Sequence, residues 1–239
     1  MKIAALQGQS LIEYPGKISA VIFTPKCNFC CVFCYVPDLV LPERIKKIKL
    51  ISQKEIFSFL NKRKKLLDAV AITGGEPTLQ EDLPSFIKKI KSLGYLVELE
   101  TNGTNPEMVR YLMDKKLVDY LAMDIKHNLL FEKYKKIVGG VLTKKIFNNI
   151  KKTIEILLNG KIDYEFRTTL IKEFHKKEDI IEICRKIKGA KIYYLQNFEK
   201  DKQTISGKKF TPFSKEEILG IVEKGGKYAN IKARPYLLR

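Results

Sequence analysis

The sequence predicts an α/β protein with a parallel sheet, folded as a partial, open β/α barrel of about six strand–helix units. Two observations predict this fold. Short runs of β-branched and apolar residues alternate along the chain with longer segments of helical periodicity. Polar residues, glycines and cysteines collect just after successive short runs, which is typical of the ligand-binding edge of a parallel sheet. A doubly wound sheet is the alternative.

Seven segments have the composition of strands. Residues 18–24 (ISAVIFT) and 69–73 (AVAIT) are short, apolar and rich in β-branched residues, as buried strands are. Segments of similar character recur between the predicted helices. They cover residues 95–101, 118–125, 162–170, 191–196 and, as a last strand in the tail, 231–237.

Six segments carry the signals of helices. Ser52 and Glu55 form a capping box at the start of residues 52–65, where apolar residues recur at helical spacing. Gly94 ends the amphipathic segment 83–93, because glycine readily adopts the backbone conformation found at helix C-termini. The other predicted helices cover residues 106–116, 142–159 with a stop at Asn159-Gly160, 177–187, and 214–223 with Ser214 as N-cap.

The length and the N-terminal sequence limit the possible organisation of the chain. Its 239 residues are enough for one substantial core, and we expect a single domain over residues 1–239. The core of that domain covers about residues 17–200, and residues 201–239 have no assigned role. The first residues lack the apolar core of a signal peptide, and no apolar run approaches the roughly 20 residues that span a bilayer. We therefore expect a cytoplasmic protein without a membrane partner.

The chain is strongly basic. Its 45 Lys and Arg residues against 27 Asp and Glu residues give a net charge of +18. A nucleic-acid surface and a solvated, lysine-rich exterior both fit this excess. The basic residues lie between the apolar positions of helix-like segments and form no aromatic-interleaved motif. We therefore favour the solvated exterior and expect no nucleic-acid partner.

Four of the five cysteines lie between Cys27 and Cys34, in the sequence CNFCCVFC. In a reducing compartment such clustering indicates a metal site rather than disulfides. One interpretation takes Cys27, Cys31 and Cys34 as a C-x3-C-x2-C set. The other takes two C-x2-C pairs, Cys27 with Cys30 and Cys31 with Cys34, as in a zinc site.

Geometry favours the three-cysteine interpretation. A tetrahedral four-cysteine site usually draws its pairs from two separated loops, and four ligands within eight residues would strain it. Three thiolates on one loop can instead cap three irons of a four-iron cluster and leave the fourth iron open to another ligand. Cys30 is then a spare residue. Cys184 lies in an apolar helical pattern and is expected in the core.

The C-x3-C-x2-C spacing, with Phe33 just before the last cysteine, resembles the signature of the radical S-adenosylmethionine (SAM) superfamily. Gly74-Gly75-Glu76-Pro77-Thr78, after the second predicted strand, resembles the GGEP motif of the same superfamily. The resemblance implies a [4Fe–4S] cluster on Cys27, Cys31 and Cys34, with SAM as the second cofactor. Glycines allow the backbone to approach a ligand closely, and carbonyls at the strand end can accept hydrogen bonds from the SAM ammonium.

Further blocks resemble the glycyl-radical-enzyme activating enzymes, especially the anaerobic ribonucleoside-triphosphate reductase activating proteins. They are SLIEYPGK at residues 10–17, ETNG at 100–103, MDIK at 123–126, YEFRTT at 164–169 and YLQNF at 194–198. Glu100 stands where relatives often have Asp. The resemblance covers about residues 8–198, and the two histidines, His127 and His175, fall in no ligand pattern.

The resemblance also implies a set of SAM contacts. Lys126 and Arg167 are expected to make charge-assisted contacts with the SAM carboxylate. The full set of expected contacts is Phe33, Tyr35, Gly74, Gly75, Glu76, Thr101, Asn102, Asp124, Lys126, Arg167 and Gln196.

The activity that the resemblance implies is an anaerobic oxidoreductase reaction. A flavodoxin or ferredoxin reduces the cluster, SAM is reductively cleaved, and the resulting 5′-deoxyadenosyl species abstracts a hydrogen atom from a glycine of a partner glycyl-radical enzyme. Anaerobic ribonucleotide reductase and pyruvate formate-lyase-like enzymes are candidate partners. The step needs no general acid or base, so no catalytic residue is assigned beyond the two cofactors.

Three other functions compete with this hypothesis. A radical SAM enzyme that acts on a small molecule would keep the cofactors and change the substrate. A basic zinc-binding module would contact nucleic acid, but it leaves the strand–helix alternation and the GGEPT block unexplained. A plain iron–sulfur electron carrier would have no use for an open iron.

Overall fold

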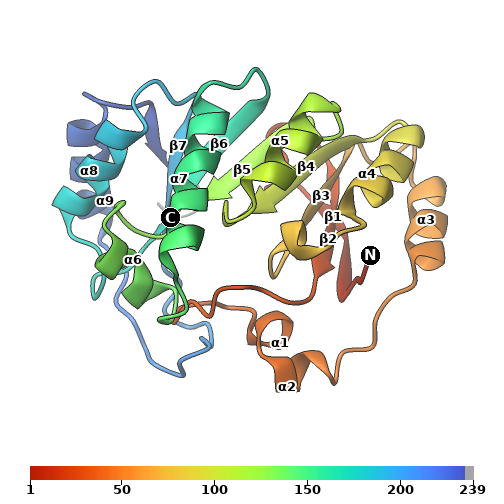
Figure 1. Ribbon diagram of the computed structural model, residues 1–239, viewed down its shortest axis with the longest axis horizontal. Helices are drawn as coiled ribbons and strands as arrows, with labels where there is room; N and C mark the ends of the chain where they lie inside the picture. Colours follow the sequence, from red (N-terminus) through yellow and green to blue (C-terminus); the bar gives the residue numbers. More distant parts are fainter. Residues whose placement is uncertain (235–239) are drawn as a thin grey trace. The chain divides into compact units, whose positions relative to one another are not determined.

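The computed structural model describes residues 1–234, and it confirms an α/β protein with a mostly parallel, open sheet (Figure 1). Strands β2 and β3, β3 and β4, β6 and β7, and β7 and β8 pair in parallel, while β1 pairs with β2 in antiparallel orientation. Strands β1 and β8 are the edges of the sheet. In sheet order the strands are β1 (Ala5–Ser10), β2 (Ser19–Thr24), β3 (Ala69–Gly74), β4 (Leu96–Thr101), β5 (Tyr120–Asp124), β6 (Asp163–Leu170), β7 (Tyr193–Asn197) and β8 (Ile231–Ala233).

Helices fill most connections between the parallel strands. The connection from β2 to β3 carries the cysteine loop and three helices, and the connection from β5 to β6 carries two. None of the helices in the described part of the chain is both long enough and apolar enough to cross a membrane. The helices are α1 (Pro37–Val40), α2 (Pro42–Ile45), α3 (Gln53–Lys62), α4 (Leu83–Ser92), α5 (Pro106–Asp114), α6 (Phe131–Ile137), α7 (Lys144–Leu158), α8 (Lys177–Lys186) and α9 (Lys215–Gly225), with a 3-10 helix, η1, at Pro77–Leu79.

The chain divides into two compact units that alternate along the sequence. The first unit consists of Met1–Asn28, Val36–Thr101 and Asn105–Ala122. The second consists of Phe29–Tyr35, Asn102–Thr104 and Met123–Arg239. The cysteine motif therefore contributes to both units, since Cys27 belongs to the first and Cys31 and Cys34 to the second. The expectation of one domain over residues 1–239 stays a prediction.

The core of the first unit is built on β2, β3 and β4. Val21 of β2 lies opposite Ala71 of β3, and both are fully buried, because central parallel strands are covered on both faces. Helix α3 contributes Ile56 and Leu60 to this core, at the helical spacing expected from the sequence. Helix α4 ends before Gly94, which has the positive φ of +91° expected of a glycine after a helix.

The core of the second unit is built on β6 and β7 together with α8 and α9. Phe166 of β6 lies opposite Tyr193 of β7, and both side chains are completely buried. Cys184 on α8 is buried as expected, and its burial raises the pKa of its thiol to about 11. This cysteine is therefore an apolar packing residue rather than a reactive thiol.

The structure contains elements that the sequence patterns did not predict. Strand β1 has the sequence ALQGQS, whose residues are mostly exposed at the edge of the sheet, so it lacks an apolar signature. Helix α6 was missed because it is short, with only seven residues. The last predicted strand, 231–237, is present as β8 over Ile231–Ala233, and residues 235–237 lie outside the described residues.

The capping box of α3 provides a test of local stability. The Ser52 Oγ accepts a hydrogen bond from the Glu55 amide at 3.2 Å, and the Glu55 carboxylate accepts one from the Ser52 amide at 2.9 Å. We expect Ser52→Ala to lower the free energy of unfolding by about 1 kcal/mol, measured by urea denaturation. Ser58→Ala, at an exposed position inside the same helix, should change it by less than about 0.5 kcal/mol. Equal losses in the two variants would contradict the cap.

Candidate functional site

The predicted SAM contacts lie mainly where strands of the sheet end. Gly74 is the last residue of β3, Thr101 the last of β4 and Asp124 the last of β5, while Gln196 is the next-to-last residue of β7. In a parallel sheet these carboxyl ends are the usual position of ligand-binding residues. The strand-end placement expected from the sequence is thus confirmed at these positions.

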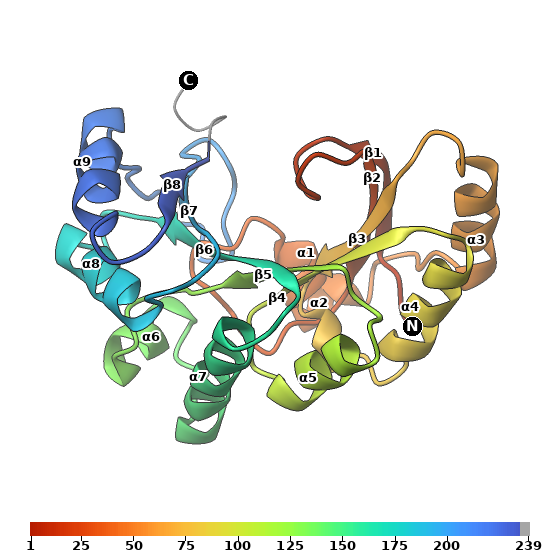
Figure 2. The same ribbon diagram turned by 90° about the horizontal axis from the view of Figure 1, so that it is seen from above.

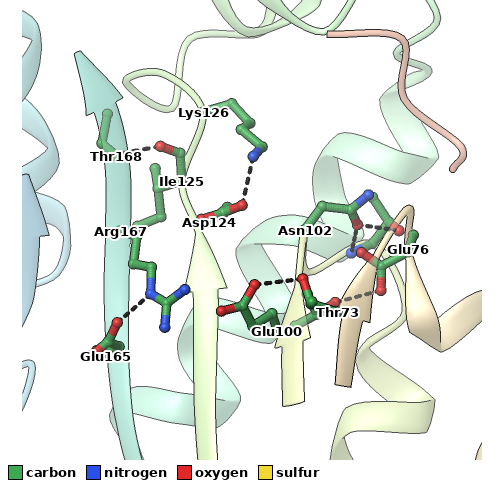
Figure 3. Close-up of polar contacts among 12 residues, drawn as sticks. Thr73, Glu76, Glu100, Asn102, Asp124, Ile125, Lys126, Glu165, Arg167 and Thr168 are labelled. Atoms are coloured by element: carbon green, nitrogen blue, oxygen red, sulfur yellow. Dashed lines mark hydrogen bonds and ion pairs between the residues drawn. The ribbon is translucent and has the colours of Figure 1, made fainter. Parts of the chain in front are cut away.

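Arg167 is an exception, because it lies inside a strand rather than after one. Strand β6 continues to Leu170, three residues beyond Arg167. The Arg167 guanidinium forms an ion pair with Glu165 (Figure 3). Glu165 also pairs with Arg234, and all three side chains are almost completely buried. Strand β6 has eight residues and is longer than the other strands. Arg167 therefore lies in its interior and not at its carboxyl end. The contact of Arg167 with the SAM carboxylate stays a prediction.

In the first unit, Gly74 and Gly75 lie against the backbone that leads into the cysteine motif. The Gly75 amide donates to the Thr24 carbonyl at 2.8 Å, and the Glu76 amide donates to the Lys26 carbonyl at 2.8 Å. A Cβ on Gly75 would overlap the Lys26 carbonyl and lie 3.2 Å from the Cys27 amide nitrogen. These positions therefore require glycine because two backbone segments of the chain lie in close contact there. The predicted contact of Gly74 and Gly75 with a ligand stays a prediction.

Glu76 joins the ends of two strands through a buried carboxylate. Its Oε1 accepts hydrogen bonds from the Thr78 amide at 3.1 Å, the Thr78 hydroxyl at 2.5 Å and the Thr101 hydroxyl at 2.7 Å. Because the Glu76 carboxylate is buried, the loss of these hydrogen bonds would be costly. Thr73 donates similarly to Glu100 at 2.6 Å (Figure 3). These carboxylates thus have a positioning role, which the motif alone did not indicate.

In the second unit, the cysteine loop is supported by the connection between α6 and α7. The Cys34 amide donates to the Cys31 carbonyl at 3.0 Å, which forms a tight turn between these two predicted ligands. The amides of Cys30 and Val32 donate to the carbonyls of Val138 and Ile137, each at 3.2 Å. Gly139 follows directly, with φ of +81°, and a Cβ there would overlap the Cys30 carbonyl.

A second support for the loop comes from residues 199–213, which we call the C-terminal strap. The Ile205 amide donates to the Cys34 carbonyl at 3.0 Å, and the Ser206 amide donates to the Val32 carbonyl at 3.3 Å. The Tyr35 hydroxyl accepts from the Glu199 amide at 2.5 Å, and burial raises the pKa of Tyr35 to about 12. Part of the segment without an assigned role, 201–239, therefore holds the cysteine loop. No motif in the sequence indicated this.

Lys126 lies in a charged cluster beside the cysteine loop. Its ammonium forms an ion pair with Asp124 at 2.6 Å (Figure 3). The same ammonium lies 5.8 Å from the centre of the Phe33 ring. Burial alone would lower the pKa of Lys126, but the negative charges of Asp124 and Cys31 outweigh it and raise that pKa. The structure thus places Cys31, Phe33 and Asp124 near the Lys126 ammonium, which stays charged at neutral pH.

Two buried histidines, to which the sequence analysis assigns no role, support the backbone at Lys126. The rings of His127 and His175 stack with their centres 4.9 Å apart. The Ile171 amide donates to Nδ1 of His175 at 3.2 Å, so Nε2 carries the proton and donates to the Lys126 carbonyl at 3.0 Å. Burial, together with the neighbouring His127, lowers the pKa of His175 to about 4. The only sequence signal was the position of His127 directly after the predicted site residue Lys126, and His175 had no such signal.

The donor chemistry of the cysteine motif suits an iron–sulfur cluster. All five cysteines lie within the described residues, and they form no disulfide. Thiolates are the ligands of such clusters. Residues 1–234 contain no group of three or more His, Cys, Asp or Glu side chains placed to hold a metal ion. The ligand set Cys27, Cys31 and Cys34 therefore rests on the sequence and stays a prediction.

Comparison with known proteins gives consistent similarities. The family model described as "Radical SAM superfamily" matches residues 21–187. The "Putative glycyl-radical enzyme activating enzyme" of Methanocaldococcus jannaschii is 35% identical over 202 residues, which cover 82% of this chain and 80% of that protein. A "GTP 3′,8-cyclase" of Sulfurovum is 31% identical over 196 residues, covering 74% of this chain and 54% of that protein.

The fold is also found among solved structures. SuiB of Streptococcus suis, bound to the precursor peptide SuiA, superposes with a TM-score of 0.66 at 17% identity. The similarity covers 90% of this chain and 48% of SuiB, so this chain spans about half of that protein. At this level of identity the likeness supports the fold alone.

The pair Gly139 and Gly140 tests the support of the cysteine loop. Both residues have φ near +80°, so an alanine at either position carries a strain of about 1–2 kcal/mol. Only Gly139 contacts the loop, since a Cβ on Gly140 meets no atom within 4 Å. We expect Gly139→Ala to bind clearly less iron after reconstitution than Gly140→Ala does. Equal iron contents would show that the contact with Cys30 is unimportant.

His175 predicts how stability depends on pH. The folded protein keeps His175 neutral down to about pH 4, while the unfolded chain takes up its proton near pH 6.5. The unfolded state therefore binds more protons between these values, and stability falls as the pH falls through this window, by about 3 kcal/mol for this group. We expect the apo-protein with His175→Gln to show a flatter dependence of unfolding free energy on pH from 7 to 4. A wild-type slope in that variant would refute this assignment, and Lys176→Gln, at an exposed neighbour, serves as control.

Proposed function

Because this chain belongs to the radical SAM superfamily, we propose that it is an activating enzyme that forms a glycyl radical on a partner protein. The observation that carries this proposal is the 35% identity with the M. jannaschii protein, which extends over 82% of this chain. The superfamily uses a [4Fe–4S] cluster and SAM, and these are the cofactors of this chain. We place its activity in an anaerobic cytoplasm, with a flavodoxin or ferredoxin as electron donor.

The residues of the cysteine motif suit the first cofactor. Cys27, Cys31 and Cys34 would hold the cluster by three thiolates, and Cys30 would remain outside the ligand set. When bound, the two cofactors supply a 5′-deoxyadenosyl species that removes a hydrogen atom from a glycine Cα. The glycine approach at Gly75 and the strap across Val32 and Cys34 keep this loop in one conformation.

The charged cluster in the second unit suits the second cofactor. The Lys126 ammonium is largely buried and carries a charge opposite to that of the SAM carboxylate. Low solvent exposure strengthens such an attraction, and the ion pair with Asp124 orients the lysine side chain. His175 holds the Lys126 carbonyl at 3.0 Å and thereby limits the movement of its backbone. Hydrogen-atom transfer needs no general base, so the proposed role of these residues is to bind SAM and to orient it.

A small-molecule substrate is the second candidate function. The similarity with the Sulfurovum GTP cyclase favours it, because this relative is also over 30% identical. The aligned region covers only 54% of the cyclase, however, against 80% of the activating-enzyme relative. We therefore place the partner glycyl-radical enzyme first. Anaerobic ribonucleotide reductase and pyruvate formate-lyase-like proteins are the candidates to test.

Cysteine substitutions test the cofactor assignment. The wild type, Cys30→Ala and Cys31→Ala would be reconstituted with iron and sulfide without oxygen, reduced with dithionite and given SAM. We expect 5′-deoxyadenosine from the wild type and from Cys30→Ala, and a loss of at least about 100-fold in Cys31→Ala, because one iron loses its thiolate. Chromatography measures the product. Equal activity of Cys31→Ala and the wild type would contradict the ligand set.

The same preparations test the substrate. A candidate glycyl-radical enzyme added to the reduced wild type should develop the electron paramagnetic resonance signal of a glycyl radical. Its variant with alanine at the radical glycine is the matched control. Rapid SAM cleavage with no radical on either candidate, but with turnover of GTP, would favour the small-molecule function.

A further inference from the structure

We propose that helices α6 and α7 present the docking surface for an acidic one-electron carrier protein that reduces the cluster. This surface, the α6–α7 surface, consists of Leu130, Lys135, Lys136, Val141, Lys144 and Lys145. The inference rests on the proposed function and assigns one of its partners to a place on the chain. Both helices lie side by side in the two views (Figures 1 and 2), and the Phe131 and Phe147 rings join them at 5.5 Å.

The first observation is an excess of positive charge. Residues 131–161 contain eight lysines and two glutamates, a net charge of +6, or one third of the total of +18. Lys133 is paired with Asp179 at 2.6 Å. Within residues 1–234, no carboxylate pairs with Lys135, Lys136, Lys144 or Lys145. Lys144 instead lies 3.7 Å from the centre of the Phe131 ring. These charges therefore remain available to an acidic partner.

The start of α7 strengthens this positive field. Lys144 and Lys145 occupy its first two positions, and its first turn carries no acidic residue. The amino end of a helix is itself positive, so lysines there add to the potential and lower the stability of the helix slightly. The arrangement attracts anionic groups and would accelerate the encounter with an acidic protein.

The second observation is exposed apolar surface within the lysine cluster. Leu130, just before α6, is 54% exposed, and Val141, in the connection to α7, is 44% exposed. Apolar groups surrounded by charged residues are typical of protein–protein interfaces, where the apolar centre is dried and the charged rim steers association. A nucleic acid or a free anion would gain little from the two apolar side chains.

The third observation places the α6–α7 surface beside the cysteine loop. The carbonyls of Ile137 and Val138, at the end of α6, accept hydrogen bonds from the amides of Val32 and Cys30. Val141 and Lys144 follow within a few residues of Gly139, which packs against the Cys30 carbonyl. A carrier docked here would lie next to the loop of Cys31 and Cys34. Electron transfer requires a short distance between the carrier and the cluster. A surface beside the cysteine loop therefore favours a redox protein over other acidic partners.

The step itself is a transfer of one electron. The reduced carrier, a flavin or iron–sulfur protein, is oxidised by one electron, and the cluster accepts that electron. No covalent bond forms or breaks in this step, and no proton has to move with it.

Charge reversal tests the surface. The triple variant K136E/K144E/K145E removes three lysines of the α6–α7 surface, and K62E/K64E/K65E makes the same change of net charge at exposed lysines at the end of α3 and just after it. The reconstituted proteins would be titrated with a purified acidic flavodoxin by calorimetry at low and high salt. We expect the first variant to bind at least about tenfold more weakly and to lose most of the salt dependence, and the second to change less than about threefold.

A second readout separates docking from chemistry. SAM cleavage driven by dithionite should be equal in the wild type and both variants, while cleavage driven by reduced flavodoxin should fall about tenfold in K136E/K144E/K145E alone. Equal binding by both variants would overturn the proposal. The proposal would also be overturned if K136E/K144E/K145E lost binding to a single-stranded oligonucleotide that the wild type binds, but still bound flavodoxin. Absence of a glycyl radical in every preparation would refute the proposed function and leave the docking result standing.

Discussion

The cysteine loop depends on close backbone contacts that a single methyl group would prevent. At its start, Gly75 of the β3 end lies against Lys26 and Cys27, and in the second unit Gly139 lies against Cys30. A side chain at either glycine would collide with a backbone carbonyl, so these approaches require glycine. This constraint matters for the predicted ligands Cys27, Cys31 and Cys34, because three thiolates that hold one cluster need a fixed spacing.

The buried charged groups of both units are paired with other groups of the protein rather than with solvent. Lys126 is a buried cation balanced by Asp124, and the neutral His175 holds its carbonyl without adding a second positive charge. Buried carboxylates such as Glu76 are satisfied by hydroxyls and amides of neighbouring strand ends. Within each unit these polar groups are therefore held by partners of the chain itself. The remaining excess of lysine lies on exposed surfaces such as α6 and α7.

Much of this arrangement could be predicted from the sequence, because its signals are local. Buried strands such as β2 and β3 are continuous apolar runs, and α3 begins at a recognisable capping box. The family blocks likewise lie at strand ends, apart from Arg167, whose position in β6 depends on the length of the strand. The strap and the histidine pair could not be predicted. Their contacts join residues far apart in sequence, and their residues match no motif.

The C-terminal strap has a consequence for how the protein is made. The hydrogen bond from Glu199 to Tyr35 joins residues 164 positions apart, and Ile205 and Ser206 bond to the same loop. During synthesis the N-terminal part emerges first, so the cysteine loop exists for most of translation without its final support. The loop can close on its last partners only after residue 206 has left the ribosome. The final conformation of the loop that carries Cys31 and Cys34 is thereby tied to a nearly finished chain.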